Sequence, residues 1–323
     1  MENIREKLFW GEIGEDAQRQ YIDARSVFTA LEDARKSAAE VRGGMYWQHK
    51  NGTDYLMRTS VNNSQKSIGP RSAETETIYK NFITRKNSAV KRVSDLGAEL
   101  VRHQKMNRAL GVGRAPRLLI DLLNKLSKSG LTGFFTVIGT HALYAYESTA
   151  GVRFAEPEAL ATRDIDLLWD VRKRLSFITQ MEVLDSSFLG LLKKVDSTFE
   201  LRPDQHYTAV NSKGFEVDVI RREMKDDDPH PVRLTDADEE EFYAVQAKKA
   251  GLLLDGAKFS SMVVSTSGHM ARMNTIAPAL FIRFKRWMAT QPDRDALKRR
   301  RDILQANLVE ELAREYLPNE TLE

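Results

Sequence analysis

The stretch T-R-D-I-D-L-L-W, residues 162–169, places two aspartates in an otherwise apolar run. Alternate residues of a β-strand face the same side, so Asp164 and Asp166 would share one face, and the apolar residues between and after them would face the core. A buried carboxylate is unfavourable unless it is paired or bound to a cation, and two neighbouring carboxylates repel each other. A divalent cation removes that penalty, and carboxylate oxygens suit Mg²⁺ or Mn²⁺. We therefore expect a strand whose polar face binds a metal ion.

The apolar context distinguishes this pair from the others in the chain. Three further Asp-x-Asp pairs begin at Asp226, Asp236 and Asp293, and none of them lies in an apolar run. Two of these pairs belong to residues 223–241, where nine acidic side chains accompany two basic ones. Such a run is typical of a solvated surface loop or the start of a helix.

Two other apolar segments contribute to the same polar face. Upstream, F-F-T-V-I (134–138) predicts a buried strand that ends at Gly139, directly before a short helix. Downstream, F-E-V-D-V-I (215–220) predicts a strand that carries a third carboxylate, Asp218. Glu216 would share the face of Asp218 and is the fallback candidate for the third acidic position.

Hydrophobic periodicity and turn signals predict a mixed α and β chain. The first third reads as a helix over 14–41, a hairpin around Asn51-Gly52 and a long basic helix over 72–109. The centre alternates strands with helices, and Pro278 can open a helix. Asp293 would cap a final helix, whose apolar side carries Leu297, Leu304, Leu308 and Leu312. We expect an N-terminal helical and hairpin region (1–110), a central core (111–276) and a C-terminal helical segment (277–323).

The composition is that of an ordinary globular protein. The chain has 323 residues, 41% of them hydrophobic, and no cysteine, which excludes disulfides and thiolate metal sites. Its N-terminus has no long apolar core, so we expect no signal peptide. No stretch approaches the roughly 20 apolar residues of a membrane helix. We expect a soluble, cytoplasmic protein.

Two basic segments flank the centre of the chain. Residues 80–128 contain twelve basic and three acidic side chains, and residues 283–301 contain eight and two. Such segments can hold phosphates or a nucleic acid, or they can simply be solvated helix faces.

The order of these elements resembles the polymerase β-like nucleotidyltransferase superfamily. Its members share a strand, a glycine turn, a helix, an Asp-x-Asp strand and a later strand with one more aspartate. Within it, I-G-T-H-A-L (138–143) and T-R-D-I-D-L-L look like the bacterial AbiEii-type toxins and related proteins, including a smaller bacterial subgroup. The resemblance implies an α+β fold, a mixed sheet flanked by helices. It also implies that Asp164, Asp166 and Asp218 are catalytic and hold Mg²⁺ or Mn²⁺.

The same resemblance suggests residues that bind the nucleotide. Gly139 and Thr140 stand where related proteins usually have Gly-Gly or Gly-Ser, and their backbone would approach the phosphates. A later helix supplies Lys285, which would neutralise the triphosphate, and Asp302. That aspartate would orient a basic residue, contact the nucleotide, or form an ion pair within its own helix. Arg163, and also Arg153, are near the site in sequence and are candidates for binding phosphate.

Two functions of different class follow. The first is a metal-dependent nucleotidyltransferase that moves a nucleoside monophosphate from an NTP to a hydroxyl of RNA, such as a tRNA end, of a protein or of a small molecule. A toxin or defence role, with an antitoxin protein as partner, follows from the AbiEii-like resemblance alone. The alternative is a catalytically silent fold that binds nucleotide or RNA. The sequence lacks the Gly-rich loop of P-loop enzymes and the His-Glu-x-x-His motif of zinc hydrolases.

Overall fold

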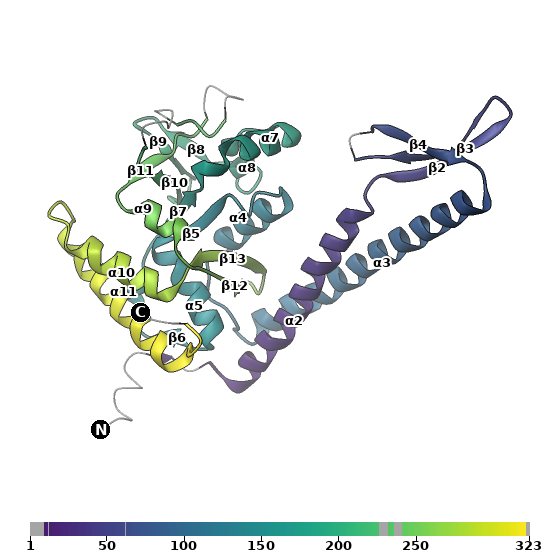
Figure 1. Ribbon diagram of the computed structural model, residues 1–323. Coiled ribbons are helices and arrows are strands. Elements are labelled where there is room, and N and C mark those ends of the chain that lie inside the picture. The colour runs from purple at the N-terminus through teal and green to yellow at the C-terminus, as the bar shows by residue number, and fades with distance from the viewer. Residues whose placement is uncertain (1–9, 12, 62, 226–231, 236–240, 321–323) are drawn as a thin grey trace. The chain divides into compact units, whose positions relative to one another are not determined.

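Figure 1 shows the computed structural model of the chain. The structure describes residues 10–11, 13–61, 63–225, 232–235 and 241–320. These residues form two compact units. Residues 19–110 make up the smaller unit, and the described residues up to Gln18 and from Gly111 onward make up the larger one. Within the described ranges, every helix is too short or too polar to span a lipid bilayer.

The smaller unit consists of two long helices and a three-stranded antiparallel sheet. Its elements are α2 (Glu15–Glu40, the first turn of which belongs to the larger unit), β2 (Gly44–Lys50), β3 (Thr53–Thr59), β4 (Gln65–Pro70) and α3 (Ala73–Ala109). The predicted hairpin is confirmed, because Asn51 and Gly52 adopt the positive φ angles, 50° and 78°, of a tight two-residue turn. Helix α3 begins at the capping hydroxyl of Ser72 and continues unbroken through Gly97.

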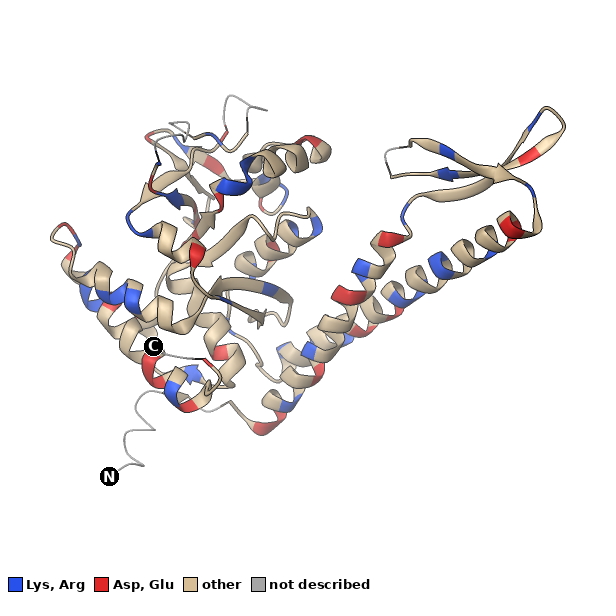
Figure 2. Cartoon of the chain, in the orientation of Figure 1, with Lys and Arg blue, Asp and Glu red and all other residues tan. Residues whose placement is uncertain are grey.

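A buried polar contact links the two long helices. Gln20 on α2 donates a 2.9 Å hydrogen bond to Asn107 on α3 and lies 2.9 Å from the ring of His103. Such a contact fixes the alignment of the helices, because any shift would leave buried polar groups unpaired. The basic side chains of α3 are interspersed with acidic ones (Figure 2), and Lys91, for example, pairs with Asp95 at 2.7 Å.

The larger unit is built on a six-stranded mixed sheet. Its strands, in order of pairing, are β5 (Phe135–Ile138), β7 (Asp164–Trp169), β10 (Glu216–Arg222), β9 (Gln205–Val210) and β8 (Glu200–Arg202), with β11 (Val245–Ala247) paired to the far end of β10. Strand β7 runs antiparallel to β5 and parallel to β10. Ile165, Leu167 and Trp169 are fully buried, which confirms the apolar face predicted for β7. The fold is thus a mixed one, with sheets and helices in the same unit.

Helices and two short antiparallel pairs complete this unit. The helical elements of this unit that precede α10 are α4 (Arg117–Lys128), η1 (Gly139–Ala142), α5 (Leu143–Ala150), α6 (Pro157–Leu160), η2 (Val171–Lys173), α7 (Arg174–Leu184), α8 (Phe188–Lys193) and α9 (Ala250–Asp255). The paired strands are β1 (Trp10–Gly11) with β6 (Arg153–Phe154), and β12 (Lys258–Val264) with β13 (Met270–Ile276). Helices α10 (Pro278–Ala289) and α11 (Ala296–Tyr316) pack side by side, and they belong to the same compact unit as the sheet.

Some details differ from the sequence-based expectation. Asp295, and not Asp293, caps the final helix, because its carboxylate accepts the backbone N–H groups of Leu297 and Lys298. Leu297 was expected on the apolar side of that helix but is 78% exposed. The short elements β8, β11 and α9 were not predicted, since segments of three to six residues carry no readable periodicity. Within the acidic run 223–241, residues 226–231 and 236–240 lie outside the described part of the chain.

Candidate active site

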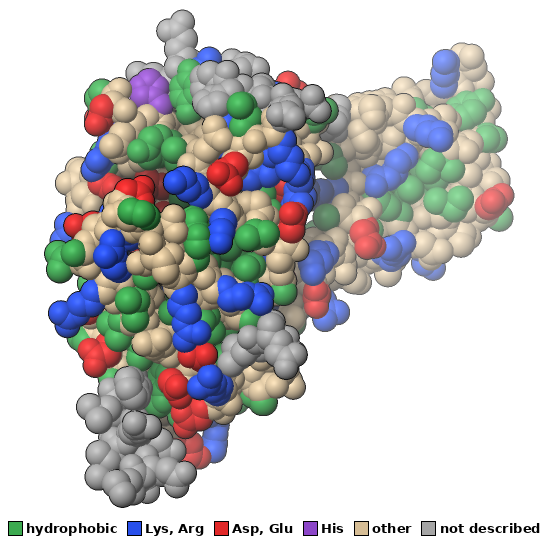
Figure 3. All heavy atoms as spheres, turned by 60° about the vertical axis from the view of Figure 1, so that its left-hand side comes forward, with side chains coloured by type: hydrophobic (Ala, Val, Ile, Leu, Met, Phe, Trp, Pro, Cys, Tyr) green, Lys and Arg blue, Asp and Glu red, His purple; other side chains and the backbone are tan. Residues whose placement is uncertain are grey.

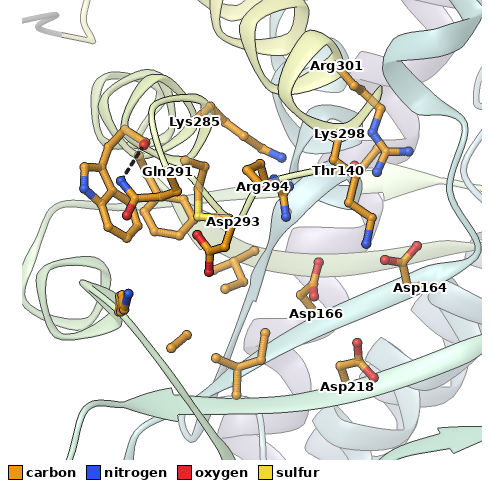
Figure 4. A pocket seen from close by; sticks show the side chains of 18 residues that line it. Thr140, Asp164, Asp166, Asp218, Lys285, Gln291, Asp293, Arg294, Lys298 and Arg301 are labelled. Atoms are coloured by element: carbon orange, nitrogen blue, oxygen red, sulfur yellow. Dashed lines mark hydrogen bonds between the residues drawn. The ribbon is translucent and has the colours of Figure 1, made fainter. Parts of the chain in front are cut away.

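Two adjacent parallel strands bring the three predicted carboxylates onto one wall. Asp166 on β7 is paired in register with Asp218 on β10, and Asp164 with Glu216. Because neighbouring residues of paired strands share a face, all four side chains project from the same side of the sheet. Figure 4 shows the carboxylates of Asp164, Asp166 and Asp218 converging on a common space.

The turn after β5 makes a close approach to this wall. Ile138 pairs with Asp166, so the next residue, Gly139, lies beside the carboxylate. Gly139 has a left-handed backbone with φ of 71°, and a Cβ atom there would lie 2.1 Å from Oδ2 of Asp166. Glycine therefore satisfies two requirements at once, the backbone angle and the lack of space.

The carboxylates line a cavity of about 510 Å³, within the range of small-molecule binding sites. The strands form one wall, and α10, α11 and the loop between them form the other (Figure 4). The predicted residues that line it are Gly139, Thr140, Asp164, Asp166, Asp218 and Lys285. Glu216 does not line it and instead pairs with Arg202, so the geometry favours Asp218 as the third acidic group.

The electrostatics of the wall are unfavourable to three free negative charges. Burial, together with the charges of Asp164 and Asp218, raises the pKa of Asp166 to about 7. No hydrogen bond or ion pair to its carboxylate is present among the described residues. Burial also raises the pKa of Asp218, against a 2.6 Å hydrogen bond from the Thr208 hydroxyl. A bound cation would therefore stabilise the ionised form of Asp166 more than that of the other two carboxylates.

Asp164 behaves differently from its neighbours. Burial opposes its ionisation, but hydrogen bonds from the Thr162 hydroxyl and from a backbone amide, together with the nearby charge of Arg301, hold its pKa below the usual value. Asp164 is therefore ionised at neutral pH and available as a ligand.

This donor set suits a hard divalent cation. Carboxylate oxygens are preferred by Mg²⁺ and Mn²⁺, and an unpaired carboxylate between two others gains most from such an ion. In the described ranges, no group of three or more acidic or histidine side chains is placed so that it could hold a metal ion by itself. Mg²⁺ does not need one, because it commonly keeps several waters and takes further oxygens from substrate phosphates. The residues fit a metal site that is open towards the cavity.

The opposite wall carries positive charge that is held by a buried aspartate. Asp302 on α11 is fully buried and accepts hydrogen bonds of 2.8 Å each from Lys285 on α10 and Arg294 on the connecting loop. Burial lowers the pKa of Lys285, while the Asp302 carboxylate favours its charged form. Both cations line the cavity, and Asp302 lies behind them.

Two predicted nucleotide-binding residues thus lie outside the main cavity. The position of Asp302 favours the role of orienting basic residues, because its ion pairs among the described residues are with Lys285 and Arg294, both of which lie outside its own helix. Arg163 precedes β7, is exposed, and lines a second cavity on the far side of Asp164. Arg153 donates to the carbonyl of Gly111 and lines neither cavity.

Several residues of the second wall were not singled out from the sequence. The cations are Arg294, Lys298 and Arg301. The apolar side chains are Phe284, Trp287 and Met288 on α10, and the amide of Gln291 follows two residues after that helix. The basic segment 283–301 was recognised as a whole, but its individual members could not be ranked without the orientation of α11. Phe284, Trp287 and Met288 are three and four residues apart on one helix, and this spacing in the sequence could have indicated that they share a face.

A side chain of α11 also contacts the turn that contains Gly139 and Thr140. Gln305 on α11 is fully buried and donates hydrogen bonds to the Thr140 hydroxyl (3.0 Å) and to the Ala159 carbonyl (2.6 Å). The adjacent His141 is buried away from the cavity, and burial lowers its pKa to about 4, so it is neutral at neutral pH. The turn therefore has fixed contacts with both walls of the site.

One comparison with known proteins gives a match. The sequence model of a protein family described as Nucleotidyltransferase matches residues 117–323. This segment contains both walls of the cavity and every predicted site residue. No curated protein and no solved structure matches the chain.

Gly139→Ala should destabilise the protein and displace Asp166. A left-handed backbone costs a residue with a Cβ atom about 1–2 kcal/mol, and the new methyl group would overlap the carboxylate. Urea denaturation measures the loss. The control is Gly133→Ala, since a Cβ at Gly133 meets nothing within 4 Å. Equal unfolding free energies for the two variants would show that the close approach is not needed.

Asp302→Ala should be among the most destabilising changes in the larger unit. It leaves the two cations that line the cavity, Lys285 and Arg294, without their counter-ion, a loss of about 3–5 kcal/mol for a broken buried pair. Asp255→Ala is the matched control, because it removes a 68% exposed carboxylate from a surface pair with Arg172, worth no more than about 1 kcal/mol. Denaturation midpoints that fall equally in both variants would contradict the assigned role of Asp302.

Proposed function

Because the chain belongs to the nucleotidyltransferase family, and so to the transferases, we propose that it moves a nucleoside monophosphate from an NTP to a hydroxyl acceptor with the help of Mg²⁺ or Mn²⁺. The observation that carries this proposal is the opposition of two charged walls across one cavity. Three carboxylates face Lys285, Arg294 and further cations of α11. The order of β5, the Gly139 turn, β7 and β10 also supports a polymerase β-like core for the larger unit.

The two walls suit the two halves of such a reaction. Asp164 and Asp166 would hold the metal ions, with Asp218 completing the site. When bound, the ions would neutralise the triphosphate and polarise the phosphorus under attack. Lys285 and Arg294 are already positioned by Asp302, so they can meet the phosphate oxygens without reorganising.

Asp218 is the group best placed to accept the proton of the acceptor. Its Oδ1 receives the Thr208 hydroxyl at 2.6 Å, which orients the carboxylate and leaves Oδ2 for another donor. Burial raises the pKa of Asp218, which makes it a better base than a solvated carboxylate. The acceptor oxygen would then bond to the α-phosphorus, the bond to the β-phosphate would break, and pyrophosphate would leave.

A second cavity, of about 660 Å³, supports RNA as the acceptor. It shares Asp164, Lys298 and Arg301 with the first cavity, and Arg163 also lines it. Lysine and arginine side chains are spread over the face of the larger unit that Figure 3 turns towards the reader. An acceptor with its own phosphates would gain from these charges, whereas an uncharged small molecule would not. The AbiEii-like subgroup, the toxin role and the antitoxin partner stay predictions from resemblance.

The direct test incubates the purified protein with each α-³²P-labelled NTP, Mg²⁺ and total RNA. Label transferred to RNA supports the proposal and identifies the base that is used. Label transferred to a protein or a small molecule would replace the RNA acceptor. Nucleotide binding without any transfer would favour the silent, nucleotide-binding alternative.

Asp166→Asn should remove metal binding and activity while the chain stays folded. In the wild-type protein, Mn²⁺ should raise the melting temperature, and more so with NTP, because the ion relieves the repulsion around Asp166. The variant should lose this rise and at least about 100-fold of any transfer activity. Its metal-free melting temperature should not fall, since an amide relieves the same repulsion. Asp170→Asn, outside both cavities, is the control, and an undiminished Mn²⁺ effect in Asp166→Asn would refute the metal site.

Arg163→Glu should weaken the RNA acceptor and leave the apparent KM for NTP unchanged, because Arg163 lines only the second cavity. The dependence of log K for RNA on log salt should become shallower by about one unit. Lys193→Glu makes the same charge change at an exposed residue of α8 that lines neither cavity. Equal RNA binding by both variants would place the acceptor elsewhere.

A further inference from the structure

The cavity has a second end whose chemistry the phosphates and metal do not use. Phe284, Trp287 and Met288 lie at helical spacing on α10, Gln291 follows two residues after the end of that helix, and all four are only partly buried. Each of them lines the cavity, opposite Ile220 and Ala247 of the sheet. Phe284 also packs against the core, and together with Trp287 and Met288 it offers the cavity an apolar surface for a flat or apolar part of a ligand.

The Trp287 ring has contacts with two neighbouring side chains. The Lys249 ammonium lies 4.7 Å from the centre of its ring, and the Phe284 ring lies 5.8 Å away. The Gln291 side-chain amide donates to the Trp287 carbonyl at 3.1 Å, which secures the end of the helix (Figure 4). The indole is therefore held in place, as a platform for stacking must be.

The loop after α10 carries one carboxylate, that of Asp293, that stabilises no other part of the described structure. In D-R-D (293–295), Arg294 pairs with Asp302 and Asp295 caps α11. Asp293 lines the cavity at its exposed rim and has no hydrogen bond or ion pair among the described residues. A free carboxylate repels the phosphates, and it can accept hydrogen bonds from a part of the substrate that donates them.

We propose that this end of the cavity binds the nucleoside, with the base stacked against Trp287 and the Asp293 carboxylate accepting hydrogen bonds from the 2′- and 3′-hydroxyls of ribose. The enzyme would thereby select ribonucleotides over 2′-deoxyribonucleotides. The inference rests on the proposed function, because it takes an NTP as the ligand and places its phosphates at the carboxylate end.

The order of groups in an NTP supports the assignment to ribose. The sugar joins the phosphates to the base, so it must lie between the metal-binding end and the aromatic end. In Figure 4, Asp293 lies between Gln291 on one side and Asp166 and Arg294 on the other. A carboxylate has two acceptor oxygens and no donor, which matches the two adjacent hydroxyls of ribose. A 2′-deoxyribose offers only one of them.

The test measures binding without turnover. Quenching of tryptophan fluorescence gives Kd for an NTP and for the 2′-deoxy-NTP of the same base, with Mg²⁺ and without RNA. The wild-type protein should prefer the ribonucleotide about tenfold or more, as expected for one charge-assisted hydrogen bond. In Asp293→Ala the preference should fall close to one, and in Asp293→Asn it should be intermediate. The ratio of the two Kd values is the readout, because both ligands carry the same triphosphate and respond equally to a general change in charge.

Two further variants separate the sugar contact from other effects. Asp295→Asn removes the same charge two residues away and keeps a good helix cap, so it should leave the ratio unchanged. Trp287→Phe should retain binding, measured by calorimetry, but lose the fluorescence quench, since Trp10, Trp47 and Trp169 lie outside the cavity. Trp287→Ala should weaken ribo- and deoxyribonucleotides equally.

The outcomes distinguish this inference from the proposed function. Selective binding that depends on Asp293, in a protein that transfers nothing, would support the nucleoside site and refute the enzyme. Transfer activity with an unchanged ratio in Asp293→Ala would refute the ribose contact alone. A change in base preference with no change in sugar preference would also overturn it, because Asp293 would then contact the base. An undiminished quench in Trp287→Phe would overturn the stacking assignment.

Discussion

Three carboxylates on adjacent strands repel one another, and the rest of the larger unit is arranged around this repulsion. The parallel register of β7 and β10 places Asp166 directly beside Asp218, and Gly139 approaches the Asp166 carboxylate so closely that no Cβ atom would fit between them. Folding cannot relieve this repulsion by a hydrogen bond to Asp166, since none is present in the described part of the chain. What the structure provides is a set of cations across the cavity, and space for a metal ion and for the phosphates it would carry.

The opposite wall carries positive charge, and one buried residue, Asp302, holds it in place. Asp302 sits behind the cavity and holds Lys285 and Arg294 in place, so that positive charge is presented to the substrate by a rigid pair. Gln305, one turn further along α11, bonds to Thr140 and so connects the same helix to the glycine turn. Helix α11 therefore aligns both walls, and a change on its buried face should affect the turn and the cations together.

Predictions from the sequence succeeded where the information is local. The alternation in residues 164–169 identified which side chains face the core, because the twofold repeat of a strand needs no knowledge of the rest of the fold. Asn51-Gly52 identified a hairpin for the same reason, since positive φ angles depend on the residues themselves. The helix cap was misassigned to Asp293 because Asp295 offers the same chemistry two residues later, and only the start of α11 decides between them.

The sequence by itself determined the acidic strands, the glycine turn and, through family resemblance, the candidate roles of Lys285 and Asp302. Only the tertiary structure decided that Asp302 lies behind the cavity, that Arg163 faces a second one, and that Trp287, Asp293 and Arg294 line the first. The reason is physical. The period of a strand or helix specifies which residues share a face, but which face meets the carboxylates depends on how α10 and α11 pack against a sheet that is distant in the chain.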